Sequence, residues 1–122
     1  MGCAMVTIQK RECDRFRPIY YAAASGDFNP IHIDHEIATL AGLPGNILHG
    51  MCTMAWAAEA AIDALGGDPG DLRRLSARFT RPVKVEDVVT FTATIEPGSR
   101  SVVLTAINQD GQEVLKNGSA EG

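Results

Sequence analysis

The apolar residues of this chain change their spacing once, and that change limits the class of fold. From about His49 to Leu65, apolar side chains recur at intervals of three and four residues, which is the pattern of a helix. After Gly70 the interval becomes two, the pattern of strands that bury one face. The predicted strands cover residues 72–80, 87–96, 101–108 and 112–118. One long helix followed by a run of strands predicts an α+β domain.

The predicted helix is unusually thin, because many of its side chains are the single methyl groups of alanine. A thin helix lets a sheet approach on several sides, so we expect the sheet to curl around it. Turn signals at residues 97–99 and at Asp110-Gly111 indicate that the strands form an antiparallel meander. An apolar stripe on the helix is expected to belong to the core or to a pocket wall: Met51, Met54, Ala55, Ala58, Ile62 and Leu65.

Shorter elements are expected before the long helix. Their predicted order is a strand at 4–9, a helix at 11–24, a loop at 25–33 and a helix at 35–41. Pro18 should break or kink the first of these helices. Asp34 is placed to cap the second helix, and Gly42 to end it.

Length, charge and cysteine content limit the classes of function. We expect a single domain over residues 1–122. The formal net charge of −4 argues against nucleic acid as the main partner. Three cysteines without CxxC spacing favour reduced thiols in the cytoplasm over a disulfide framework. No secretory signal and no apolar run of membrane-spanning length is found, so no membrane association is expected.

The residues with catalytic potential are concentrated in the segment YAAASGDFNPIHIDH. Asp27 and His32 place a carboxylate and an imidazole five residues apart, on a loop stiffened by Pro30. An isolated Asp-x-Asn-Pro sequence is most often a simple turn. Here the acid/base pair is followed by His49-Gly50 at the start of the long helix. Together these features predict an enzyme that moves protons and water on a small organic substrate.

Three sequence patterns together resemble a known family. They are Y-A-x-x-S-G-D-x-N-P-I-H-x-D, then H-G-M, then R-F-x-x-P-V. The combination resembles the MaoC-like (R)-specific enoyl hydratases and dehydratases, and most of all the small actinobacterial (3R)-hydroxyacyl dehydratase subunits. The likeness covers roughly residues 14–120. It implies a hotdog fold, in which an antiparallel sheet wraps around a long central helix, and assembly as a homodimer or a heterodimer of related subunits.

The resemblance also implies roles for individual residues. Asp27 and His32 would carry the catalysis, and the backbone N–H of Gly50 would bind the thioester carbonyl. The implied substrates are trans-2-enoyl or (3R)-3-hydroxyacyl thioesters of coenzyme A or acyl carrier protein, in fatty-acid or polyketide-type metabolism. Asn29 would hold the loop or hydrogen-bond the pair or the substrate. Because the reaction exchanges only protons and water, no cofactor is expected.

Simpler roles are expected for the other candidate residues. His35 is expected to be solvated at a helix start, and His49 to orient the turn at Gly50. Cys52 is expected in the core rather than as a nucleophile. A metal site built from Asp27 and the histidines is not expected, because the His-x-x-His spacing suits neither a helix face nor a familiar zinc motif.

Arg74 and Arg78 share one face of the first predicted strand after the helix. An ordinary solvated sheet face explains them. The functional alternative is a docking site for the phosphates of coenzyme A or for an acidic acyl carrier protein.

Two other functions are compatible with this fold class. A hotdog acyl thioesterase would use a carboxylate and water at the carbonyl carbon, and the Asp27/His32 pairing disfavours it. A non-catalytic subunit would instead complete the acyl pocket of a heterodimeric dehydratase, and the intact acid/base pair argues against this role.

Overall fold

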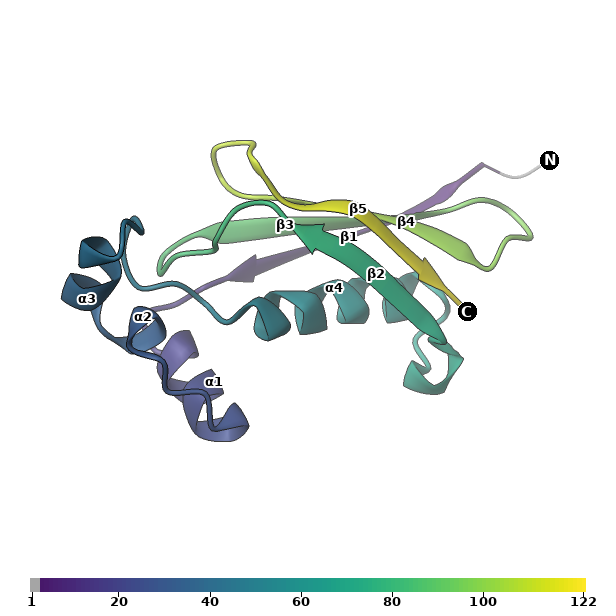
Figure 1. Ribbon diagram of the computed structural model, residues 1–122. Helices are drawn as coiled ribbons and strands as arrows, with labels where there is room; N and C mark the ends of the chain where they lie inside the picture. Colours follow the sequence, from purple (N-terminus) through teal and green to yellow (C-terminus); the bar gives the residue numbers. More distant parts are fainter. Residues whose placement is uncertain (1–2) are drawn as a thin grey trace.

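A five-stranded antiparallel sheet covers one long helix in this computed structural model, which describes residues 3–122 (Figure 1). The strands are β1 (Met5–Glu12), β2 (Arg74–Phe79), β3 (Val88–Ile95), β4 (Ser101–Ile107) and β5 (Glu113–Glu121). The helices are α1 (Arg17–Ser25), α2 (Pro30–Ile33), α3 (His35–Leu40) and α4 (Gly50–Ala64), with a 3-10 turn at Pro69–Asp71. The expected α+β class is confirmed, and each predicted strand has a counterpart.

The strand order β1-β3-β4-β5-β2 corrects the expected continuous meander. Strands β3, β4 and β5 follow one another as expected, but β2 pairs with β5 and not with β3. Strand β1 occupies the free edge of β3, in a register that runs from Met5 opposite Ile95 to Glu12 opposite Val88. Because both edges of β3 are taken, β2 joins the sheet beyond β5. Strands β1 and β2 therefore form its two edges.

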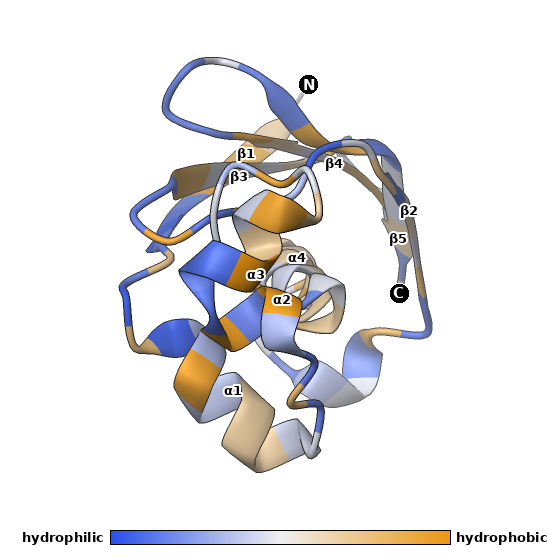
Figure 2. Ribbon diagram, turned by 60° about the vertical axis from the view of Figure 1, so that its left-hand side comes forward, coloured by the Kyte–Doolittle hydropathy of each residue, from blue (hydrophilic) through white to orange (hydrophobic). Residues whose placement is uncertain are grey.

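Helix α4 lies against the concave side of the sheet, and α1, α2 and α3 gather near its N-terminal end (Figures 1 and 2). Trp56 meets Phe91 of β3 edge to face, with ring centroids 6.3 Å apart. Val89 and Ala93 of the same strand are fully buried beside it. The small residues of α4 allow this close approach. Its buried residues are Cys52, Thr53, Trp56, Ala57, Ala60 and Ala61.

The apolar stripe predicted on α4 is not the side that packs on the sheet. Met51 is 67% exposed at the N-terminal end of the stripe. Its half-buried members are Met54, Ala58 and Ile62. Only Leu65, at the far end, is buried. Because alanine is common on both sides of α4, the sequence makes two sides of the helix apolar. The sheet covers one of them, and the side that carries Met51 and Met54 is not covered by the sheet.

The first half of the chain differs from the prediction in its boundaries. The predicted strand at 4–9 is confirmed but continues to Glu12, so the predicted helix at 11–24 begins only at Arg17. Pro18 does not kink this helix, because it stands in the first turn, where the missing N–H has no intrahelical partner to lose. Asp34 caps α3 as predicted, and its carboxylate accepts a hydrogen bond from the Ile37 N–H at 3.1 Å.

Strand β5 extends three residues beyond the predicted end at 118, through an irregularity of pairing. Asn117 has a φ of +55°, and the Asn117-Gly118 pair resembles a turn in sequence. A Cβ on Gly118 would lie 2.6 Å from the carbonyl oxygen of Leu104, so the neighbouring strand requires glycine here. The strand continues because its partners on both sides hold it. Across residues 3–122, no helix is both long enough and apolar enough to cross a membrane.

Candidate active site

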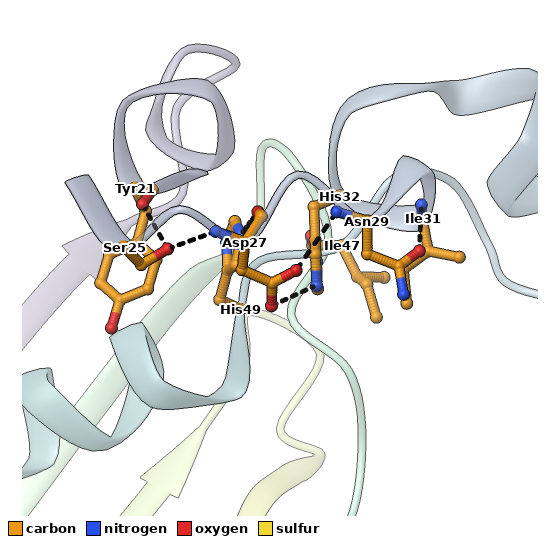
Figure 3. Close-up of polar contacts among 8 residues, drawn as sticks. All are labelled: Tyr21, Ser25, Asp27, Asn29, Ile31, His32, Ile47 and His49. Carbon is orange, nitrogen blue, oxygen red and sulfur yellow. Dashed lines mark hydrogen bonds and ion pairs between the residues drawn. The ribbon is translucent and has the colours of Figure 1, made fainter. Parts of the chain in front are cut away.

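The predicted acid/base residues lie where the loop after α1, helix α2 and the start of α4 meet (Figure 3). They surround a cavity of about 210 Å³. Its lining residues are Tyr21, Ser25, Asp27, His32, His49, Gly50 and Met51. The structure therefore brings together three of the residues singled out in the sequence, the motif carboxylate, the motif histidine and the helix-start glycine.

Asp27 is held by the end of helix α1. Gly26 adopts a left-handed conformation with a φ of +80° and so turns the chain out of the helix. The Ser25 hydroxyl donates to the Tyr21 carbonyl at 2.8 Å and accepts from the Asp27 N–H at 3.2 Å (Figure 3). The Asp27 carboxylate accepts the N–H of Asn29 at 3.2 Å, and its side chain remains 56% exposed. One carboxylate oxygen is thus anchored while the group stays open to the cavity.

The predicted loop at 25–33 is wrong in its second part, because residues 30–33 form helix α2. This helix orients His32. Asn29 caps this helix, with its side-chain oxygen accepting the Ile31 N–H at 3.2 Å, and Pro30 is its first residue. His32 is 8% exposed, and its Nδ1 lies 2.8 Å from the carbonyl oxygen of Ile47. A carbonyl oxygen only accepts, so Nδ1 carries a proton, and in the neutral ring the lone pair is on Nε2. That Nε2 lies 3.7 Å from Oδ2 of Asp27.

His49 contacts the motif loop. It precedes α4 and forms no side-chain capping hydrogen bond there, and its expected role in orienting the turn at Gly50 stays a prediction. Its Nε2 donates to the Asp27 carbonyl at 2.9 Å. Its ring stacks on that of His32, with centroids 3.8 Å apart and planes 20° apart, and contacts Tyr21 at 4.8 Å. Sequence reasoning missed this contact, because nothing local marks a bond across 22 residues.

Gly50 is the first residue of α4, where the N–H has no intrahelical partner and the helix dipole favours negative charge. The ring of Phe79 covers its Cα, because an added Cβ would lie 3.1 Å from Phe79 Cζ. Gly50 also lines a second cavity of about 320 Å³. The other lining residues are Ile47, Leu48, Thr53, Phe79, Thr80, Arg81, Pro82 and Val83. Gly50 thus lines two cavities.

The remaining candidates lie elsewhere or have ordinary surroundings. Arg74 and Arg78 are exposed on β2, and neither lines the two cavities beside Gly50. His35 begins α3 and lines a separate cavity next to Gly45. Cys52 is buried, and burial raises the pKa of its thiol, which suits a core residue rather than a nucleophile.

The potential ligand atoms of Asp27, His32 and His49 lie within 4.8 Å of one another. His35 is not part of this group, so the arrangement is not a His-x-x-His site. One nitrogen of each imidazole is already bonded to a backbone carbonyl, which leaves one nitrogen on each ring. The geometry therefore offers a proton-transfer pair and a neighbouring histidine.

Comparisons with known proteins identify relatives of this chain. A profile of the family described as "MaoC like domain" matches residues 5–114. The chain is 43% identical over 104 residues to 3-hydroxyacyl-thioester dehydratase Y of Mycobacterium tuberculosis, covering 80% of this chain and 36% of that protein. It is 38% identical over 92 residues to the peroxisomal enoyl-CoA hydratase 2 of Arabidopsis thaliana, covering 75% of this chain and 29% of that protein.

A solved structure is similar over nearly the whole chain. R-Hydratase PhaJ1 from Pseudomonas aeruginosa superposes with a TM-score of 0.80 at 28% identity, covering 99% of this chain and 80% of that chain. The chain nevertheless spans only about a third of the length of the two curated relatives.

Proposed function

We propose that this chain, which belongs to the MaoC-like domain family, is an (R)-specific hydro-lyase acting on acyl thioesters. The reaction is the reversible hydration of trans-2-enoyl thioesters to (3R)-3-hydroxyacyl thioesters. The family has the hotdog fold, and the sheet wrapped around α4 agrees with that expectation. The observation that carries the proposal is the orientation of His32, whose free Nε2 faces the Asp27 carboxylate across 3.7 Å.

This separation suits a water molecule shared by the two groups. It exceeds the length of a direct hydrogen bond, and a deprotonated carboxylate and an imidazole lone pair are both acceptors. A water placed there can donate one hydrogen to each group. In the hydration direction, the pair takes one proton from this water as its oxygen bonds to C3, and then gives that same proton to C2 on the same face, so both groups end in their starting states. Both transfers use Asp27 and His32, so the addition is syn.

Gly50 supplies the remaining requirement, a donor for the charge that develops on the thioester oxygen. Its N–H is at the N-terminus of α4, and the cavity that it lines also contains both acid/base residues. One such donor is worth about 3 kcal/mol in other enzymes. Asn29 acts through the loop, because its side-chain oxygen is used to cap α2. Protons and water are the only species exchanged, and we propose that no metal or other cofactor takes part.

The test is a spectroscopic assay with crotonyl-CoA and longer trans-2-enoyl-CoAs. We expect loss of the enoyl absorbance and formation of the (3R)-hydroxyacyl product, identified by chiral analysis. Release of free thiol without hydration would indicate the thioesterase instead. An inert chain that becomes active only with a related subunit would indicate the non-catalytic partner role. An acyl carrier protein thioester tested in parallel separates the two carriers.

We also propose that the chain works as a dimer. The open stripe of α4, with Met51 67% exposed, has the composition of a contact surface rather than a solvated face. Edge strands β1 and β2 have backbone groups free for pairing with a second subunit. Two such helices lying antiparallel under one continuous sheet would cover both features. A homodimer is the simplest form, and a heterodimer with a related hotdog subunit uses the same surfaces.

Three further points stay predictions: the domain extent, the location and the carrier docking. The single domain over residues 1–122 and the cytoplasmic location stay predictions, and the Arabidopsis relative is named as peroxisomal. Docking of the carrier's phosphates by Arg74 and Arg78 also stays a prediction, since both side chains are exposed and available to an anion.

A further inference from the structure

The side chain of His49 connects two parts of the site that are far apart in the sequence. Asp27 belongs to the loop after α1, whereas Gly50 begins α4. His49 directly precedes Gly50, and its Nε2 donates to the Asp27 carbonyl at 2.9 Å (Figure 3). We propose that His49 is a positioning residue that sets the distance between the acid/base pair and the thioester-carbonyl donor. This role rests on the proposed hydratase function.

The contacts of His49 show which of its nitrogens donates a hydrogen bond. Nε2 faces a carbonyl oxygen, so it carries a proton. Nδ1 is buried, and no atom of residues 3–122 reaches it with a hydrogen bond. A second proton there would bury an unpaired N–H and a charge in a residue that is only 3% exposed. The contact with the Asp27 carbonyl thus places a proton on Nε2.

The contact between the two rings also bears on the chemistry of His32. The two rings stack at 3.8 Å, and the His32 ring must accept a proton when water is activated. A charged His49 would repel that proton, whereas a neutral ring leaves Nε2 of His32 free to take it. The stack meanwhile holds the His32 ring in the plane that points Nε2 toward Asp27.

Two substitutions separate the hydrogen bond from the stack. His49→Phe keeps an aromatic ring against His32 and removes the donor, whereas His49→Gln keeps an N–H donor at similar reach and removes the ring. If the tether to Asp27 sets the geometry, His49→Phe should lower kcat by about 100-fold, the effect of displacing a reacting group by about 1 Å. KM should change by less than about threefold, because uniform binding is not lost. His49→Gln should recover at least about tenfold of the lost kcat.

Melting temperature and oligomeric state are measured for both variants, so that a folding defect in one leaves the other informative. A folded His49→Phe variant with kcat within about threefold of the wild type would overturn the proposal, and so would equal losses in the two variants.

A second measurement does not depend on activity. Long-range ¹H–¹⁵N spectra of the wild-type imidazoles should show His49 protonated on Nε2 and His32 on Nδ1, and residues 26–29 should exchange their amides faster in His49→Phe than in His49→Gln. A His49 that is charged or protonated on Nδ1 near neutral pH would overturn the positioning role even in an active hydratase. The expected spectra together with no hydration of any enoyl thioester would support the tether and overturn the proposed function.

Discussion

Replacing Gly50 by alanine tests the thioester-carbonyl donor directly, because the substitution keeps the backbone N–H and adds one methyl group. The new Cβ would lie 3.1 Å from Phe79 Cζ and 3.4 Å from both Cε atoms, so the ring must shift by a few tenths of an ångström. Phe79 is 54% exposed, which leaves the ring room to move. Alanine also favours a helix over glycine by about 1 kcal/mol. The free energy of unfolding should therefore change by less than about 1 kcal/mol.

Activity should respond far more strongly than stability. The methyl group would lie against Phe79, in the lining of the 320 Å³ cavity, and would crowd the approach of a thioester to the Gly50 N–H. Holding the carbonyl about 1 Å away from its donor should lower kcat/KM by about 100-fold. That loss corresponds to about 2.7 kcal/mol of transition-state stabilisation. The assay is the initial rate of enoyl absorbance loss with crotonyl-CoA, next to a thermal unfolding curve for the same preparation.

A double-mutant cycle with Phe79→Leu separates the two effects of the methyl group. Leucine removes the ring that the methyl would push, so it should restore any loss caused by a displaced Phe79. We expect the double variant to stay as inactive as Gly50→Ala, because the methyl still keeps the thioester from the N–H. A folded Gly50→Ala enzyme with half or more of the wild-type kcat/KM would refute the assignment of this N–H as the donor.

The other predictions concern the acid/base pair, metal independence, assembly and carrier docking. Asp27→Asn and His32→Ala should each lower kcat by at least about 100-fold without unfolding the chain, and their losses should not add, because the pair holds one water. A variant that keeps a tenth of the activity would remove that residue from the pair. EDTA should leave the rate unchanged, whereas loss restored by zinc would indicate a metal enzyme. Met51→Glu should shift the chain toward monomer in sedimentation velocity, since it places a charge on the open stripe of α4; an unchanged dimer would place the interface elsewhere. The double change of Arg74 and Arg78 to alanine should raise KM for enoyl-CoA, but not for an N-acetylcysteamine thioester, and the difference should shrink as salt screens exposed charges beyond about 8–10 Å. Equal loss on the truncated substrate would assign the arginines to folding.

The parts of this fold that could be predicted are those with a local signal. Helix α4 and the strands were visible because their periodicity lies within each segment. The pairing of β2 with β5 was not, since it follows from β1 filling the edge of β3, which is a long-range choice. The same division holds in the site. Asp27 and His32 are five residues apart and could be paired from sequence, whereas the contact of His49 with Asp27 spans 22 residues and needed the structure.

Backbone carbonyls, rather than neighbouring charges, give the two histidines their roles. The carbonyl of Ile47 fixes the proton of His32 on Nδ1, and that of Asp27 fixes the proton of His49 on Nε2. Ile47 is itself held in place by two hydrogen bonds to neighbouring residues of α2. Its N–H donates to the Ile31 carbonyl at 3.0 Å, and its carbonyl accepts from Nδ1 of His32. None of these bonds uses the side chain of residue 47. The direction in which His32 presents Nε2 is therefore set by how helix α2 packs on the segment before α4, together with the stacking of the His49 ring on that of His32.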